Sequence, residues 1–168
     1  AMFDSQAGLH AGRDDLQAGP RYYRKWELCE QTNPQRIADF DTAMTGADVL
    51  IAASRPGPGI VKPQSISLMA DRSIVFACAN PVPEIYPHEA KAAGATIVAT
   101  GRGDFPNQVN NSLGFPGILK GALMVRARGI SDEMAITAAR SLAAYAEARG
   151  IGPDNIMPRM DERSVFPQ

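Results

Sequence analysis

The sequence predicts an α/β fold in which a parallel β-sheet carries helices on both faces, and three observations indicate it. Three short apolar runs, at 48–54, 73–80 and 95–100, lack the alternation of polar and apolar residues typical of a half-exposed strand, so both faces of each strand should be buried. Each run ends in a stretch rich in Gly, Pro or Asn, which are turn-forming residues. The segments between the runs are long enough for a crossover helix and too long for a hairpin.

Helix signals precede each of the apolar runs. Asn33 and Pro34 are a typical N-cap and first helical residue, and they predict a helix that stops at Gly46. Pro63 and Pro87 predict the beginnings of two further helices in the same way. Helices that alternate with buried strands are typical of successive βαβ units.

Further helices are expected before and after the three apolar runs. Ser131 predicts the cap of a long helix that closes at Gly150, and shorter helical stretches are expected at 20–31 and 112–126. With 168 residues the chain has the size of one domain. Its expected divisions are 1–47, with loops and helices after an incomplete strand; 48–128, with βαβ units and ligand loops; and 129–168, with C-terminal helices and the tail.

Composition argues against several classes of protein. The formal net charge of -1 leaves no surplus of basic residues for a nucleic acid or an anionic membrane. No stretch approaches the roughly 20 apolar residues of a membrane span, and no signal-peptide pattern opens the chain, so a cytoplasmic location is expected. Cys29 and Cys78 stand far apart with no His at metal-ligand spacing. His10 and His88 are expected to be surface or capping residues rather than catalytic ones.

Candidate ligand loops follow all three apolar runs, at 54–59, 80–84 and 101–111. In an open parallel sheet, ligands bind beyond the carboxyl ends of the strands. Amide side chains can donate to a carboxylate and accept from a ribose hydroxyl, which suits a small polar substrate and a nucleotide cofactor. The alternative is that Asn111 or Ser112 caps the following helix while the other amides face solvent. The third loop carries Asn107, Gln108, Asn110 and Asn111.

Two further features concern a nucleotide site. Asp4 follows the expected strand end, where dinucleotide-binding folds carry an acid that accepts from the adenosine ribose; a loop carboxylate that caps a turn is the alternative. No GxGxxG phosphate-binding sequence occurs. Gly114, Gly117 and Gly121 lie at helix-face spacing and predict the close approach of another backbone.

Four segments together resemble the C-terminal NAD(P)-binding domain of bacterial-type malic enzymes: MFDSQAGL, ANPVPEI, ATGRGDFPNQVNN and GFPGILKGAL. The resemblance implies a Rossmann-like, truncated dinucleotide-binding domain that lacks its own first part and the whole N-terminal domain. Members of the family oxidatively decarboxylate L-malate to pyruvate and CO₂ with NAD or NADP and with Mg²⁺ or Mn²⁺. Their catalytic tyrosine and lysine and their metal ligands precede the matching region, so none is expected in this chain. Asp4 matches the family's adenosine-ribose acid.

The resemblance also implies roles for residues in the three loops. Asn80 and Asn111 match positions that contact the substrate carboxylates and lie near the nicotinamide, which makes Asn80 a cofactor contact as well. Asn110 matches a position near the nicotinamide ribose. Ala53 and Ser54 match residues that line the dinucleotide groove. These amides would orient the substrate and would transfer no protons.

Three hypotheses follow for the chain as a whole. It is part of a malic enzyme that acts only with its missing half, a stand-alone nucleotide- or metabolite-binding module, or a subunit that another chain completes. The first hypothesis predicts that the chain alone neither oxidises L-malate nor binds dinucleotides tightly. If the first βα unit is missing, Val49 and Ile51 should lie poorly covered near an unpaired strand edge, which predicts a homo-oligomer.

Overall fold

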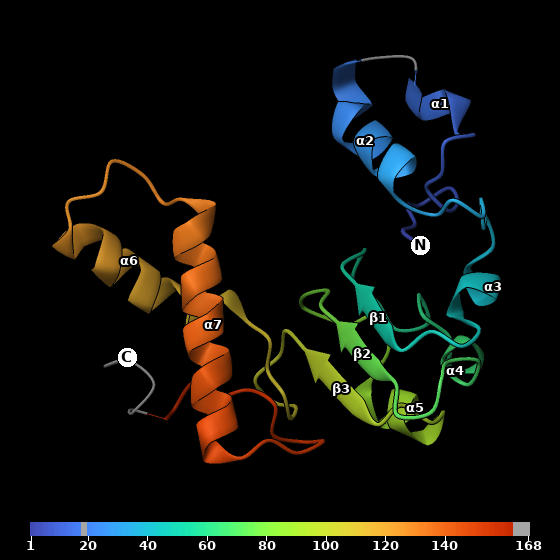
Figure 1. The fold of residues 1–168 in the computed structure, drawn as a ribbon. Helices are drawn as coiled ribbons and strands as arrows, with labels where there is room; N and C mark the ends of the chain where they lie inside the picture. The colour runs from blue at the N-terminus through green and yellow to red at the C-terminus, as the bar shows by residue number, and fades with distance from the viewer. Residues whose placement is uncertain (18–19, 163–168) are drawn as a thin grey trace.

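The computed structural model describes residues 1–17 and 20–162. A small helical group lies near the N-terminus, a three-stranded sheet with short helices follows it, and a pair of helices lies beyond the last strand (Figure 1). Among the described residues, no helix has both the length and the apolar character needed to cross a membrane. The sheet is the part of the molecule that positions the candidate ligand loops.

The central sheet is parallel, with its strands in the order β1-β2-β3. β1 is Val49–Ala52, β2 is Ile74–Ala77 and β3 is Ile97–Thr100. The register aligns the first residues of the three strands with one another, and likewise the last ones. Each strand lies within one of the apolar runs, where Val and Ile favour extended backbone. The parallel sheet predicted from these runs is confirmed.

Two short helices connect the strands, and both begin at the predicted prolines. α4 is Pro63–Ile66 and α5 is Pro87–Ala92. Proline suits the first turn of a helix because its missing N–H would have no partner inside the helix. After α5 the chain turns at Gly94, whose φ of 111° is readily adopted only by glycine.

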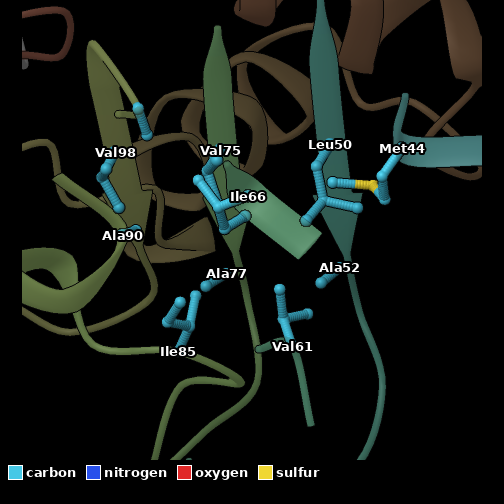
Figure 2. Packing of buried hydrophobic residues seen from close by; sticks show 11 residues of the cluster. Met44, Leu50, Ala52, Val61, Ile66, Val75, Ala77, Ile85, Ala90 and Val98 are labelled. Atoms are coloured by element: carbon cyan, nitrogen blue, oxygen red, sulfur yellow. The ribbon is translucent and has the colours of Figure 1, made fainter. Parts of the chain in front are cut away.

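One hydrophobic core joins these helices to a single face of the sheet. Leu50, Val75 and Val98 come from adjacent strands, while Ile66 and Ala90 come from α4 and α5 (Figure 2). Burial of an aliphatic side chain as large as Val or Leu contributes about 1.5–3 kcal/mol to stability. The whole cluster comprises Met44, Leu50, Ala52, Val61, Ile66, Val75, Ala77, Ile85, Ala90, Ala95 and Val98.

The opposite face of the sheet is open at β1, where the expectation of burial on both faces is wrong. Val49 is 47% exposed and Ile51 is 69% exposed, whereas Leu50 and Ala52 between and after them are buried. The cause is that α4 and α5 pack on the same face, so the alternate residues of β1 meet solvent. β1 is also an edge strand among the described residues. The poorly covered edge expected at Val49 and Ile51 is therefore present.

This open edge predicts self-association of the chain. An unpaired strand with apolar side chains is a template for strand addition, so light scattering across a dilution series should show dimers or larger assemblies. Ile51→Lys should shift the distribution towards monomers, because a charge on the edge opposes pairing. Ile136→Lys, at an exposed apolar position of the C-terminal helix pair, serves as the control. An equal effect of both substitutions would show that the edge is not the contact.

The helix before β1 begins later than predicted. α3 is Phe40–Met44, and Asp39 rather than Asn33 caps its first turn. Asn33 has a φ of 54°, and its side-chain oxygen accepts from the Ile37 N–H at 2.9 Å. Asn33 therefore stabilises a turn, as asparagine often does in left-handed backbone.

The N-terminal group forms a small core of its own. Its helices are α1 (Asp14–Gln17), η1 (Pro20–Tyr22) and α2 (Tyr23–Gln31). The predicted strand end at the N-terminus reduces to one antiparallel bridge, between Phe3 and Gly8. A side chain at position 8 would collide with a backbone carbonyl of the segment before α3, so only glycine fits there. The buried members of this second core are Leu9, Leu16 and Cys29.

The C-terminal helix pair consists of α6 (Phe115–Met124) and α7 (Asp132–Arg149). The Ser131 hydroxyl accepts from the Met134 N–H, which confirms the predicted cap of α7. The close backbone packing expected at the glycines of α6 is not seen among the described residues, because a Cβ at Gly117 or at Gly121 would have no neighbour within 4 Å. A groove of about 510 Å³ separates the two helices there.

Candidate functional site

The three candidate loops begin side by side at one edge of the sheet. The last residues of the strands, Ala52, Ala77 and Thr100, are aligned in the register, so the loops that follow them leave from neighbouring points. This is the edge at which parallel sheets bind ligands. Ala53 and Ser54 are exposed directly after β1, and Asn80 is exposed after β2.

A buried carboxylate connects the first loop to the second. Glu84 is 0% exposed, and one of its oxygens, Oε1, accepts from the Ser54 N–H at 2.7 Å and from the Ser54 hydroxyl at 3.1 Å. The other oxygen, Oε2, accepts from the Ala79 N–H at 3.0 Å. A buried carboxylate is tolerated because such hydrogen bonds replace those lost from water.

The second loop is connected in turn to the third. Arg102 donates to the Pro81 carbonyl oxygen at 2.9 Å, and its guanidinium also pairs with Asp104. Within the third loop, the Asn110 amide donates to the Gly101 carbonyl oxygen at 3.0 Å. Together with the bonds of Glu84, these contacts hold all three loops in one arrangement.

The amides of the third loop divide into two kinds. Asn110 caps the short helix η2 (Asn111–Leu113), because its side-chain oxygen accepts from the Ser112 N–H at 3.0 Å. A side-chain cap is therefore present, but it is Asn110 and not Asn111 or Ser112, the two residues named for this role in the sequence analysis. Asn80 and Asn111 are both exposed, and within residues 1–17 and 20–162 neither side chain has a hydrogen-bond partner. Their amides are available to a ligand.

Asn107, in contrast, is a buried structural residue. Its amide nitrogen donates to the carbonyl oxygens of Val98, at 3.1 Å, and Pro153, at 2.7 Å. Its side-chain oxygen accepts from the Ile156 N–H at 2.9 Å. Asn107 thereby fastens the third loop to β3 and to the segment that follows α7.

Asp4 lies on the N-terminal segment, where positively charged groups surround it. Its side chain is 10% exposed and pairs with Arg13 at 3.3 Å and with Lys25 at 3.0 Å. Burial opposes ionisation, but hydrogen bonds from the Gln6 and Ala7 amides and from the two cations outweigh it and hold the pKa of Asp4 well below its usual range. Asp4 is therefore ionised at neutral pH, with both oxygens already accepting hydrogen bonds.

Replacing Asp4 by asparagine is expected to lower the free energy of unfolding at neutral pH by about 1–3 kcal/mol, because hydrogen bonds between charged groups are lost. The pKa of Asp4 is lower in the folded chain than in the unfolded one, so this stability is present above the ordinary value of 3.8 and is lost as the pH falls towards the folded pKa. The difference between Asp4→Asn and wild type should accordingly shrink below about pH 4.

Chemical denaturation at several pH values measures this difference. Asp71→Asn is the matched control, because Asp71 is exposed and has no hydrogen-bond partner among the described residues. An Asp4→Asn deficit that stays constant down to pH values well under 4 would contradict the assigned ion pairs.

Metal-binding and thiol chemistry find little support among the described residues. There, no group of three or more His, Cys, Asp or Glu side chains could hold a metal ion. Both cysteines are free, and Cys29 is buried. Burial, followed by the nearby Glu84 carboxylate, raises the pKa of the Cys78 thiol, so this thiol is protonated at neutral pH.

Glu84 is the residue of this site that sequence reasoning did not identify. It lies within the segment ANPVPEI, where an acid stands among prolines and apolar residues just after a buried strand. An acidic residue in such surroundings either faces solvent or accepts hydrogen bonds inside the protein. The apolar surroundings of Glu84 in the sequence are therefore the signal by which this residue could have been identified.

Comparison with known proteins gives extensive matches. The NADP-dependent malic enzyme of Halomonas elongata is 43% identical over 142 residues, which are 84% of this chain and 31% of that protein. The bifunctional malic/malolactic enzyme of Bacillus subtilis is 39% identical over 167 residues, 99% of this chain and 39% of that protein. The crystal structure of the Entamoeba histolytica malic enzyme is 65% identical with a TM-score of 0.95, and the match covers 99% of this chain and 34% of that one.

The chain thus spans between about a third and two fifths of the length of these relatives. The family model described as malic enzyme, NAD binding domain, matches residues 1–165, which is almost the whole chain. The parallel sheet and its loops agree with that description. The chain therefore belongs to the malic enzyme family, as an NAD-binding domain of the Rossmann type.

Proposed function

We propose that this chain is the dinucleotide-binding part of an NAD- or NADP-dependent malic enzyme, which converts L-malate to pyruvate and CO₂. The observation that carries the proposal is the pair of exposed amides at Asn80 and Asn111, which have no hydrogen-bond partner in the described part of the chain and lie on loops that hydrogen bonds hold together. A neutral amide can donate to a carboxylate without adding a charge to the site. Malate has two carboxylates, so these residues suit it.

Each loop would then have a distinct role. Asn80 and Asn111 bind the substrate carboxylates next to the nicotinamide, and Asn80 contacts the cofactor as well. Asn110 lies near the nicotinamide ribose, where its bonds to Gly101 and Ser112 hold its orientation. Ala53 and Ser54 line the groove for the dinucleotide. The chemical contribution of these residues is positioning.

Asp4 remains the proposed acceptor for the adenosine ribose. Because Arg13 and Lys25 already donate to it, a ribose hydroxyl would have to replace one of these bonds. Lys25 is the replaceable partner, since its side chain is 42% exposed whereas Arg13 is nearly buried. The free cysteines are in keeping with a reducing compartment, which supports the proposed cytoplasmic location.

The divalent metal of the proposed reaction would be held outside this chain. When bound there, Mg²⁺ or Mn²⁺ would supply Lewis-acid chemistry at a substrate oxygen. The part of the chain that the structure describes offers no three-ligand group for it, so this chain would contribute only the residues that orient substrate and cofactor.

A hybrid enzyme tests the proposal directly. In the hybrid, this chain replaces the matching segment of the Entamoeba histolytica malic enzyme, with which it shares 65% identity over 99% of its length. We expect malate-dependent reduction of NAD or NADP in the presence of Mn²⁺. Asn111→Ala in the hybrid should reduce the rate strongly, whereas Ile136→Lys, far from the loops in the sequence, should not. A folded hybrid with no activity on malate would contradict the proposed function.

A further inference from the structure

The hydrogen bonds of Glu84 determine which way the Ser54 hydroxyl points. Both oxygens of the carboxylate face N–H groups, which can only donate: that of Ser54 at 2.7 Å and that of Ala79 at 3.0 Å. No cation pairs with Glu84 among the described residues. In all three of these contacts, including the one from the Ser54 hydroxyl, Glu84 is therefore the acceptor.

The Ser54 hydroxyl is consequently used as a donor towards the protein interior, at 3.1 Å from Glu84. Its backbone N–H is used in the same direction. Since the hydroxyl hydrogen is used inside, what Ser54 presents at the exposed edge is the lone pairs of its hydroxyl oxygen, which are acceptors. A ligand group beside it must supply a hydrogen.

We propose that Glu84 is a positioning residue that holds Ser54 as a hydrogen-bond acceptor for a ribose hydroxyl of the dinucleotide. This inference rests on the proposed function. A phosphate oxygen does not suit the same place, because an ionised phosphate brings only acceptors. The Ser54 hydroxyl would thus contact the sugar rather than a phosphate.

Glu84→Gln changes the chemistry at constant size. The carboxamide has one accepting oxygen and one donating nitrogen, so the N–H of either Ser54 or Ala79 loses its acceptor. In the hybrid enzyme we expect the KM for the dinucleotide to rise about tenfold, the effect of a lost hydrogen bond to a charged group, while kcat changes less than about threefold. Glu147→Gln, at an exposed carboxylate of α7, should leave both unchanged.

The combination of Glu84→Gln with Ser54→Ala separates positioning from a general structural effect. If Glu84 acts through the Ser54 hydroxyl, its replacement should raise the KM much less in the S54A background than in the wild-type background. A structural effect would be equal in both. Equal effects in the two backgrounds, or an unchanged KM in E84Q, would overturn the inference while the activity of the hybrid still supported the proposed function.

Two measurements keep the test decisive if the E84Q hybrid fails to fold. Ser54→Ala alone retains Glu84 and should raise the dinucleotide KM several-fold with little change in kcat; an unchanged KM would overturn the inference. In the isolated chain, hydrogen exchange at the Ser54 and Ala79 amides should be faster in E84Q than in E147Q, and equal exchange rates would show that Glu84 does not hold these loops. An inactive, folded hybrid would instead contradict the proposed function.

Discussion

With L-malate, Mn²⁺ and either NAD or NADP, the chain by itself is expected to produce no reduced dinucleotide. It spans about a third of the Entamoeba histolytica enzyme, and we expect from the family resemblance that the acid, base and metal ligands of the reaction lie outside it. Enzymes lower reaction barriers by at least about 8 kcal/mol. The loss of the catalytic groups therefore reduces the rate by about a millionfold or more. Absorbance of the reduced nicotinamide measures the result.

The control for this assay is the hybrid enzyme, which contains the same residues in a complete catalytic setting. Turnover by the isolated chain that Asn111→Ala abolishes would contradict the prediction, because such activity could not come from a contaminating enzyme. Calorimetric titration adds a second readout. We expect dissociation constants for NAD and NADP no tighter than about millimolar, whereas micromolar affinity would support the stand-alone binding module.

The second large effect is expected at Asn107, where replacement by alanine should lower the free energy of unfolding by about 2–4 kcal/mol. The substitution leaves the buried carbonyl of Val98 and the N–H of Ile156 without their partners, and each such loss costs about 1–3 kcal/mol. The φ of 56° adds strain, since asparagine adopts this conformation more readily than alanine.

Chemical denaturation of the isolated chain measures the effect of Asn107→Ala. Asn111→Ala is the matched control in the same loop, because the exposed Asn111 side chain has no hydrogen-bond partner among the described residues. It should change stability by less than about 0.5 kcal/mol. Similar losses in the two variants would mean that Asn107 does not anchor the loop.

The three strands could be predicted from the sequence because burial on a parallel sheet requires apolar runs. Leu50, Val75 and Val98 lie where those runs predicted. The exposed Ile51 could not be recognised from its own strand, because an apolar residue looks the same whether or not another element covers it. An open edge was expected only on the condition, implied by the family resemblance, that a first βα unit is missing.

The sequence could not show which amides of the third loop are structural and which are exposed, for a similar reason. Asn107 and Asn111 stand in the same polar loop, and their spacing does not distinguish them. What separates them is the arrival of Pro153 and Ile156, which are distant in the chain and carry no mark of that contact. The Glu84 bonds to Ser54 likewise join residues from different loops. The family resemblance identified the exposed asparagines, whereas the supporting contacts emerged only from the structure.

The attachment of the third loop to the segment after α7 has a consequence for the growing chain. Synthesis proceeds from the N-terminus, and domains fold as their parts leave the ribosome. The sheet strands and the asparagines are made early, but Asn107 cannot complete its bonds until Ile156 has emerged. In a nascent chain that stops before α7 ends, the loop that carries Asn110 and Asn111 therefore lacks the hydrogen bonds that hold it to the C-terminal segment.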